Sequence, residues 1–142
     1  MSEDNRPAAA IEPLLTLNAR TATVCKVTGT PYGDRSVVNA EGGSFTGARL
    51  RGRILPTGGD WLLRAPGRSL IDVRLALETD DGVTVLLRYT GKASQRDGQP
   101  RLEIAGSFDA PEGPYGWLND VQAFGLGFVT AEGVAYHFYR FA

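Results

Sequence analysis

Cysteine and histidine are nearly absent from this sequence, which contains one of each, Cys25 and His137. A single cysteine cannot form an intrachain disulfide. The usual zinc sites need several Cys and His ligands, so they are excluded as well. No serine elbow of the hydrolase type accompanies His137, and the sequence does not support a catalytic triad. We therefore expect no metal and no cofactor.

The sequence also lacks an excess of charge of either sign. Its 15 Lys and Arg residues stand against 16 Asp and Glu residues, for a net charge of −1. Such a surface does not attract nucleic-acid phosphates or anionic lipids over a distance. No run approaches the ~20 apolar residues of a membrane span, and the first ten residues lack the apolar stretch of a secretory signal. We expect a cytoplasmic protein that binds neither nucleic acid nor membrane.

Glycine and proline, in contrast, are abundant, at 18 and 8 residues. Inside helices they would cost ~1 and ~3 kcal/mol each. They lie instead in turn signals between runs of Val, Leu, Ile, Thr and Tyr, which is typical of β structure. Turns are expected at Thr30–Gly33, Glu41–Gly43, Pro56–Gly59, Pro66–Gly67, Asp80–Gly82, Asp97–Gly98 and Glu132–Gly133. The predicted strands are 14–28, 36–40, 48–55, 60–65, 69–79, 83–93, 101–109, 121–130 and 134–141.

These strands favour a single antiparallel eight-stranded barrel over a sandwich. Glycines inside the predicted strands (Gly52, Gly91, Gly125 and Gly127) can relieve bending at barrel corners, and the connections are short. One helical turn is expected near residues 114–119. Residues 1–12 are interpreted as a flexible leader and residues 13–142 as one domain. A barrel of this size encloses at most one small ligand.

Six short motifs carry a family resemblance. They are YGDR (32–35), GGSFTGARLRG (42–52), LPTGGDW (55–61), LIDVRL (70–75), TDDG (79–82) and YGWLN (115–119). In order and spacing they resemble the DUF3237 family, also called UPF0311, and imply a calycin-type barrel similar to allene oxide cyclase. The wider group of barrels includes cofactor-free cyclases of apolar molecules. The sequence departs from the family pattern in a longer segment at Lys92–Arg101.

Asp72 and Arg74 alternate with apolar residues on one predicted strand. In one interpretation the apolar face forms the core and the pair is a weak surface ion pair, worth ~0–1 kcal/mol. In the other, the apolar face meets a partner subunit, and Arg74, held by Asp72, binds a ligand oxygen inside the barrel. The resemblance adds weight to the second interpretation, and both remain open.

Asp60 precedes Trp61 after a Gly-Gly pair. It either forms an ordinary Asx turn or lies at the barrel mouth, where Trp61 would shield it from water. Shielding would raise its pKa and suit it to move a proton. His137 shares a strand face with Tyr139 and Phe141 and is interpreted as a packed aromatic.

Aromatic residues suggest a further part of a pocket. Tyr115, Trp117 and Asn119 lie on the expected helical turn. In one interpretation the aromatic rings plug the end of the core; in the other they form a gate that contacts a ligand. Tyr89 and Arg35 are secondary candidates, because a buried phenol needs a hydrogen-bond partner.

The leading hypothesis is a cofactor-independent lyase, isomerase or cyclase for a small apolar or aromatic molecule bound in the barrel. Its catalytic residues would be Asp60, Asp72 and Arg74, and its substrate-binding residues Arg35, Trp61, Tyr89, Tyr115, Trp117 and Asn119. The alternatives are a non-catalytic carrier or sensor with the same pocket, and an interaction protein with a filled barrel. We also expect a homo-oligomer, in the simplest case a dimer.

Overall fold

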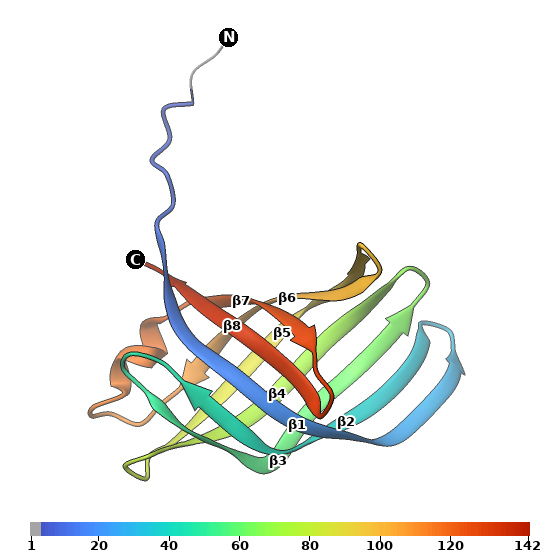
Figure 1. Cartoon of the computed structure of the whole chain (residues 1–142), viewed down its shortest axis with the longest axis horizontal. Coiled ribbons are helices and arrows are strands. Elements are labelled where there is room, and N and C mark those ends of the chain that lie inside the picture. The colour runs from blue at the N-terminus through green and yellow to red at the C-terminus, as the bar shows by residue number, and fades with distance from the viewer. Residues whose placement is uncertain (1–3) are drawn as a thin grey trace.

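Eight antiparallel strands follow one another in chain order and close into a barrel, because β8 pairs with β1 (Figure 1). The computed structural model describes residues 4–142. Residues 4–10 form no strand, and residues 1–3 of the expected leader lie outside the described part. The elements are β1 (Ile11–Thr30), β2 (Gly33–Thr46), β3 (Arg51–Ala65), β4 (Arg68–Thr79), β5 (Thr84–Arg96), β6 (Gln99–Asp109), the 3-10 helix η1 (Gly116–Asp120), β7 (Ala123–Val129) and β8 (Gly133–Phe141).

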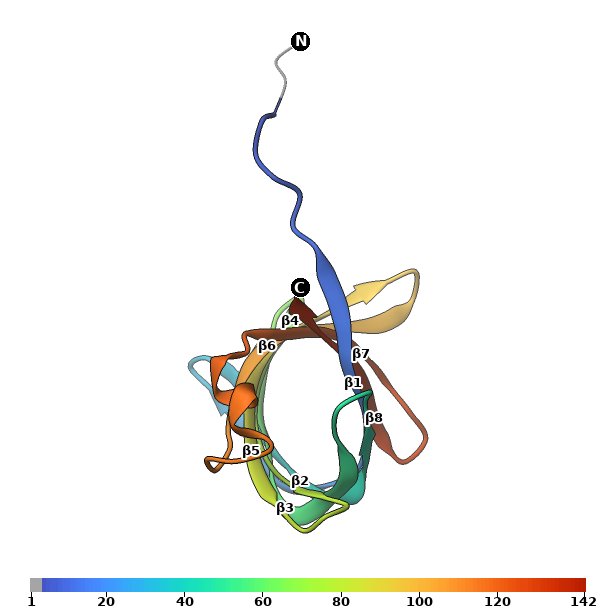
Figure 2. The ribbon, with the colours of Figure 1, turned by 90° about the vertical axis from the view of Figure 1, so that its left-hand side faces the viewer.

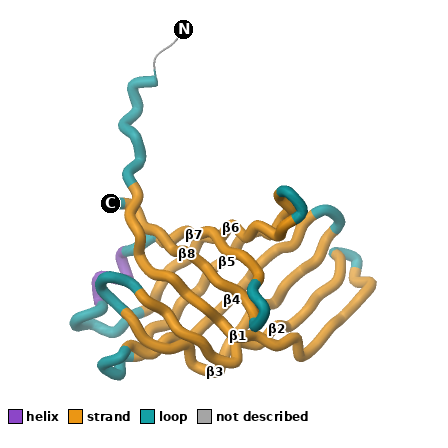
Figure 3. The backbone as a smooth tube through the Cα atoms, viewed as in Figure 1, coloured by secondary structure: helices purple, strands orange, loops and turns teal. Residues whose placement is uncertain are grey.

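Two of the predicted turns are irregularities inside strands. The strand register shifts between Asn39 and Gly43 in β2, and between Ile54 and Gly58 in β3. The two strands predicted at 48–55 and 60–65 are therefore one strand, β3. Gly58 has a φ of +80°, and a Cβ on it would lie 2.1 Å from the carbonyl oxygen of Arg74. A bulge of this kind bends a strand without ending it, so β3 can follow the barrel wall (Figure 3).

Strict alternation along β4 decides which face of the sheet forms the core. Ile71, Val73, Leu75 and Leu77 are at most 5% exposed and point into the barrel. Burying each such side chain contributes ~1.5–3 kcal/mol. Asp72 and Arg74 lie between them in sequence and are therefore on the outer face, where both are exposed. The prediction that this pair projects into the cavity is wrong, because the uniformly apolar face of β4 fills the barrel itself.

One end of the barrel is closed by η1 and the segment that follows it. Leu118 is completely buried and Val121 nearly so. The Asn119 side chain accepts a hydrogen bond from the Ala110 amide (2.8 Å) and donates to the Ala110 carbonyl (2.9 Å), which anchors η1 to the end of β6. Figure 2 looks along the barrel from this end and shows η1 beside the ring of strands. Within residues 4–142, no helix is long and apolar enough to cross a membrane.

Candidate functional site

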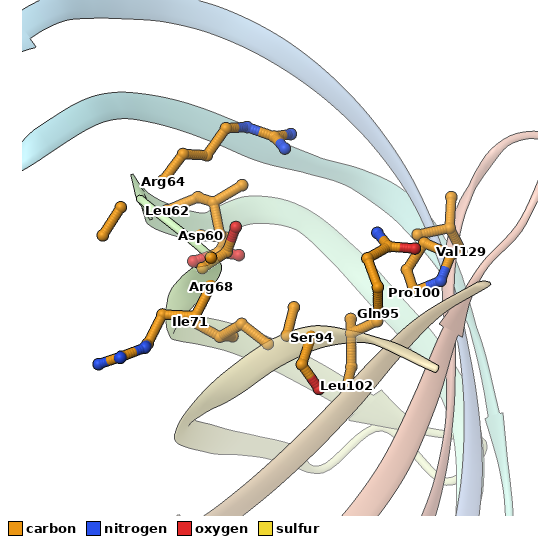
Figure 4. A pocket seen from close by; sticks show the side chains of 14 residues that line it. Asp60, Leu62, Arg64, Arg68, Ile71, Ser94, Gln95, Pro100, Leu102 and Val129 are labelled. Carbon is orange, nitrogen blue, oxygen red and sulfur yellow. The ribbon is translucent and has the colours of Figure 1, made fainter. Parts of the chain in front are cut away.

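A cavity of about 430 Å³ opens inside the barrel at the end opposite η1. Strands β3, β4, β5 and β6 form most of its wall, and the end of β7 completes it (Figure 4). The lining is Asp60, Leu62, Arg64, Ala65, Gly67, Arg68, Ser69, Ile71, Ala93, Ser94, Gln95, Pro100, Leu102 and Val129. Most of these side chains are apolar or small, so the few ionisable ones define the chemistry of the cavity.

Asp60 reaches the cavity because of its register in the sheet. It is paired with the inward-pointing Val73 on β4, and paired residues lie on the same face of a sheet. Its Oδ1 atom accepts a hydrogen bond of 2.9 Å from the backbone amide of Asp72. The bulge between Ile54 and Gly58 lies shortly before it, where a turn between two strands was expected from the sequence.

Burial raises the pKa of Asp60 to about 6. The hydrogen bond from the Asp72 amide opposes this shift, the Asp72 carboxylate adds to it, and the positive charges of Arg35 and Arg64 oppose it. A carboxyl group with a pKa this close to neutrality can both release and accept a proton under physiological conditions. This is the property expected of a general acid or base.

Two buried phenols, Tyr89 and Tyr136, accompany Asp60 inside the barrel. Their ring centroids are 5.1 Å apart in an edge-to-face arrangement, and each residue is 2% exposed. Burial raises the pKa of both hydroxyl groups, and the nearby Asp60 charge raises them further. Both phenols therefore stay protonated at neutral pH and can act as hydrogen-bond donors. The charge of Asp60 thus acts on two phenols inside a mainly apolar core.

Tyr136 was missed at the sequence level, because only the other face of β8 was considered, where His137 does pack against an aromatic ring, that of Phe128 (centroids 6.0 Å apart). Tyr136 and Phe138 point inward, whereas His137 is exposed on the outer face, where its Nδ1 lies 3.2 Å from the hydroxyl of Thr16. The pairing of Leu17 with Tyr136 determines this orientation, since Leu17 is fully buried. The sequence carries no signal that could have found Tyr136, because both faces of the last strand are aromatic: Tyr136 and Phe138 lie on one, and His137, Tyr139 and Phe141 on the other.

The rim of the cavity carries two arginines, Arg64 and Arg68, which the sequence analysis did not select. Across the opening, Gln95 and Pro100 come from the hairpin that joins β5 and β6. The segment Lys92–Arg101, which departs from the family pattern, is thus not a linker. It extends both strands and builds one wall of the cavity.

Four predicted site residues gather outside the barrel rather than in the cavity. Arg35, Trp61, Asp72 and Arg74 line an outer groove of about 630 Å³ across β2, β3 and β4. Trp61 is 62% exposed. It follows Asp60 directly, so the alternation of the strand places the two side chains on opposite faces. The prediction that Trp61 shields Asp60 is therefore wrong; the barrel interior does so.

Tyr115, Trp117 and Asn119 lie at the closed end and share no cavity with Asp60. The Tyr115 hydroxyl donates a hydrogen bond of 2.8 Å to Asp81, and the Arg49 guanidinium lies 3.7 Å from the centre of the Trp117 ring. These contacts hold η1 against the wall at this end of the barrel. Tyr115 and Trp117 pack against the core, as in the plug interpretation.

No group of three or more His, Cys, Asp or Glu side chains in residues 4–142 is arranged to hold a metal ion. The polar side chains of the cavity come instead from single residues on different strands. Asp60 and Arg64 lie on β3, Ser69 on β4 and Gln95 on β5.

The comparisons with known proteins agree with this barrel. The profile of the family described as "Protein of unknown function (DUF3237)" matches residues 9–141. The chain belongs to this family. A UPF0311 protein of Rhodopseudomonas palustris (strain TIE-1) is 28% identical over 86 residues, which are 60% of this chain and 56% of that protein. The match thus spans little more than half the length of this relative.

Solved structures of the same fold extend the comparison over the whole chain. A β-barrel-like protein from Acinetobacter baumannii AYE is 28% identical, with a TM-score of 0.85 over 99% of this chain and 100% of its own. A structure described as an enzyme from Penicillium herquei is 22% identical, with a TM-score of 0.77 over 99% of this chain and 100% of its own. The predicted family and the predicted eight-stranded barrel are both confirmed.

Proposed function

We propose that the chain is a cofactor-independent enzyme of the lyase, isomerase or cyclase type, acting on a small apolar or aromatic molecule held in the barrel. The observation that carries the proposal is Asp60, a carboxyl group with a pKa of about 6 on the inner wall of a cavity of about 430 Å³. The barrel of the Penicillium herquei enzyme supports it, because the same fold there belongs to an enzyme.

In this proposal Asp60 moves the proton. Its Oδ1 is held by the Asp72 amide at 2.9 Å, so the carboxyl group keeps one orientation while its other oxygen faces the substrate. Leu62, Ile71 and Leu102 exclude water from the reacting atoms. A dry, shaped cavity with one positioned proton-transfer group is sufficient for eliminations and double-bond shifts.

Tyr89 was predicted to bind the substrate, but neither Tyr89 nor Tyr136 is among the residues that line the cavity. Both belong to the buried core. Arg74 cannot stabilise a negative charge in the cavity either, because it lies on the outer face of β4. The proposed catalytic group is therefore Asp60.

The test uses a nitrobenzisoxazole, a small aromatic molecule that reports on any positioned base. A base removes the ring C–H proton while the ring N–O bond breaks, and the product is a coloured cyanonitrophenolate. We expect turnover above that of buffer, with a rate that rises through about pH 6 as Asp60 loses its proton, and no turnover by Asp60→Asn. Asp72→Asn, which removes a carboxylate from the outer face, should keep the rate. Equal rates for wild type and Asp60→Asn would overturn the proposal.

A carrier or sensor is the second candidate, and the burial of the phenols favours it. Tyr89 and Tyr136 are each only 2% exposed, which limits their reach into the cavity. A carrier would bind apolar molecules and release them unchanged. Wild type would then convert the nitrobenzisoxazole no faster than Asp60→Asn does. Mass spectrometry of ligands recovered after incubation separates the two functions.

We further propose that two copies of the chain pair through the outer groove. The indole of Trp61 is exposed there beside Arg74 and Asp72. Neither of these charged side chains forms an ion pair within residues 4–142. Around a two-fold axis the same patch meets itself, so Arg74 of each copy can face Asp72 of the other. An exposed tryptophan between such charges is a typical anchor of an interface.

A further inference from the structure

The rim of the barrel cavity carries positive charge, whereas the cavity interior carries none. Two arginines, Arg64 and Arg68, lie at the rim, and Asp60 is the only acidic residue among the lining side chains. Within residues 4–142, Arg64 forms no ion pair and no side-chain hydrogen bond. A guanidinium with free donors at the mouth of an apolar cavity is a ready site for an anionic group.

The direction of the two arginine side chains separates their roles. Figure 4 shows Arg64 extending toward the far wall, where Gln95 and Val129 lie, while Arg68 runs away from the cavity. Residues 60, 62 and 64 of β3 share one face, which brings Arg64 to the same side as Asp60. Arg64 is therefore the cation positioned to bind a molecule that has entered the barrel.

The spacing along β3 sets the length of that molecule. Arg64 lies four positions after Asp60, and a strand rises ~3.3 Å per residue, so their Cα atoms are about 13 Å apart. The wall between them is formed by Leu62, Ile71 and Leu102. The negative charge of Asp60 repels an anion from the inner end of the cavity, and the positive charge of Arg64 attracts it to the outer end.

We propose that the molecule bound in the barrel is an apolar organic acid whose anionic group pairs with Arg64 at the rim and whose apolar body extends inward to Asp60. This inference rests on the proposed function, because it assumes that the cavity is the binding site. It adds the substrate class and a binding residue, Arg64. The arrangement orients the molecule, so that the end remote from the anion is the one that meets the proton-transfer group.

Two fluorescent probes with one skeleton test the charge requirement. Anilinonaphthalenesulfonate is anionic, and phenylnaphthylamine is the same molecule without the sulfonate. We expect wild type to bind the anionic probe roughly tenfold more tightly, as one charge-assisted hydrogen-bonded pair permits. Arg64→Gln should remove this preference and leave the affinity for the neutral probe unchanged.

Matched variants distinguish the cavity from other parts of the surface. Arg74→Gln makes the same change in the outer groove, away from the cavity. It should keep the tenfold preference. Leu62→Trp, which fills the cavity, should weaken both probes, and circular dichroism verifies that each variant keeps the fold.

Several results would overturn the inference. Among them are equal binding of the two probes by wild type, a preference that survives Arg64→Gln, and a preference that Arg74→Gln removes instead. None of these results decides the proposed function, because the nitrobenzisoxazole reaction tests Asp60 separately. If neither probe binds, the cavity does not take ligands of this size, and the inference is wrong together with the carrier function.

Discussion

Asp60 and Asp72 are joined across the β3–β4 pair by a hydrogen bond of 2.9 Å from the Asp72 backbone amide to Oδ1 of Asp60. The two side chains lie on opposite faces of the sheet, so the backbone of one acid positions the carboxyl group of the other. The bond favours the ionised form of Asp60, yet burial outweighs it and raises the pKa to about 6. The carboxyl group is thus held in place without losing its affinity for a proton.

The first prediction concerns the stability of Asp60→Asn against pH. In the folded chain Asp60 has a pKa of about 6, above the ordinary aspartate value of 3.8. The folded state therefore binds the proton more tightly, and wild type loses stability as pH rises from about 4 to about 6. Asn carries no charge at any pH and keeps an oxygen that can accept the Asp72 amide. Above pH 6 we expect the variant to be more stable by roughly 1–2 kcal/mol, allowing for partial exposure.

Urea unfolding at about pH 4 and about pH 8 measures this difference. The gain should be present at the higher pH and disappear at the lower one, where the carboxyl group of the folded chain is protonated. An advantage of equal size at the two pH values would contradict the prediction, because it would come from packing rather than from ionisation.

How far the sequence predicts this structure is seen on β4. The alternation of Ile71, Val73 and Leu75 with Asp72 and Arg74 predicts the strand and its two faces. It does not say which face is inside, because an apolar face can pack in a barrel or against another subunit with a similar gain in free energy. Only closure of the eight strands, a property of the whole chain, settles the question.

The candidate site was predictable only in part for the same reason. Asp60 was selected because the Asp60-Trp61 pair resembles the family pattern, and the structure places Asp60 in the cavity, although Trp61 does not shield it. Tyr136 and Arg64 were missed, since nothing local separates an inward tyrosine from its neighbour His137 or a rim arginine from an exposed one. Their positions depend on the pairing of β8 with β1 and on the bulge in β3.

The bulge in β3 supports a second prediction. Gly58→Ala would place a Cβ 2.1 Å from the carbonyl oxygen of Arg74, at a φ of +80°. Gly67→Ala is the matched control, because Gly67 has a φ of +79° and no atom within 4 Å of the added Cβ. We expect Gly67→Ala to cost roughly 1–2 kcal/mol for its backbone conformation, and Gly58→Ala about 2 kcal/mol more for the clash. Similar losses in urea unfolding would show that the strand can shift away from β4.

A third prediction separates the closed end of the barrel from the cavity. Asn119→Ala removes the hydrogen bonds of 2.8 and 2.9 Å that hold η1 to Ala110, at an expected cost of roughly 1–3 kcal/mol in the free energy of unfolding. Binding of phenylnaphthylamine should not change, because the cavity opens at the opposite end. A variant that stays folded but loses affinity for this probe would instead support the gate predicted from the sequence.

The last prediction tests the proposed pairing of two copies through the outer groove. In Arg74→Asp, positions 72 and 74 of β4 are both acidic. The carboxylates of the two copies would then face each other across the two-fold axis and repel. We expect this variant to be a monomer, and the charge exchange Asp72→Arg with Arg74→Asp to restore the dimer, because the opposite charges face each other again. Analytical ultracentrifugation measures both states, and Trp61→Ala should weaken the dimer without changing the charges. If wild type sediments as a monomer, or if Arg74→Asp remains a dimer, the outer groove is not the interface. Restoration by the double variant has the greatest weight, since general damage to the fold cannot be repaired by a second charge reversal.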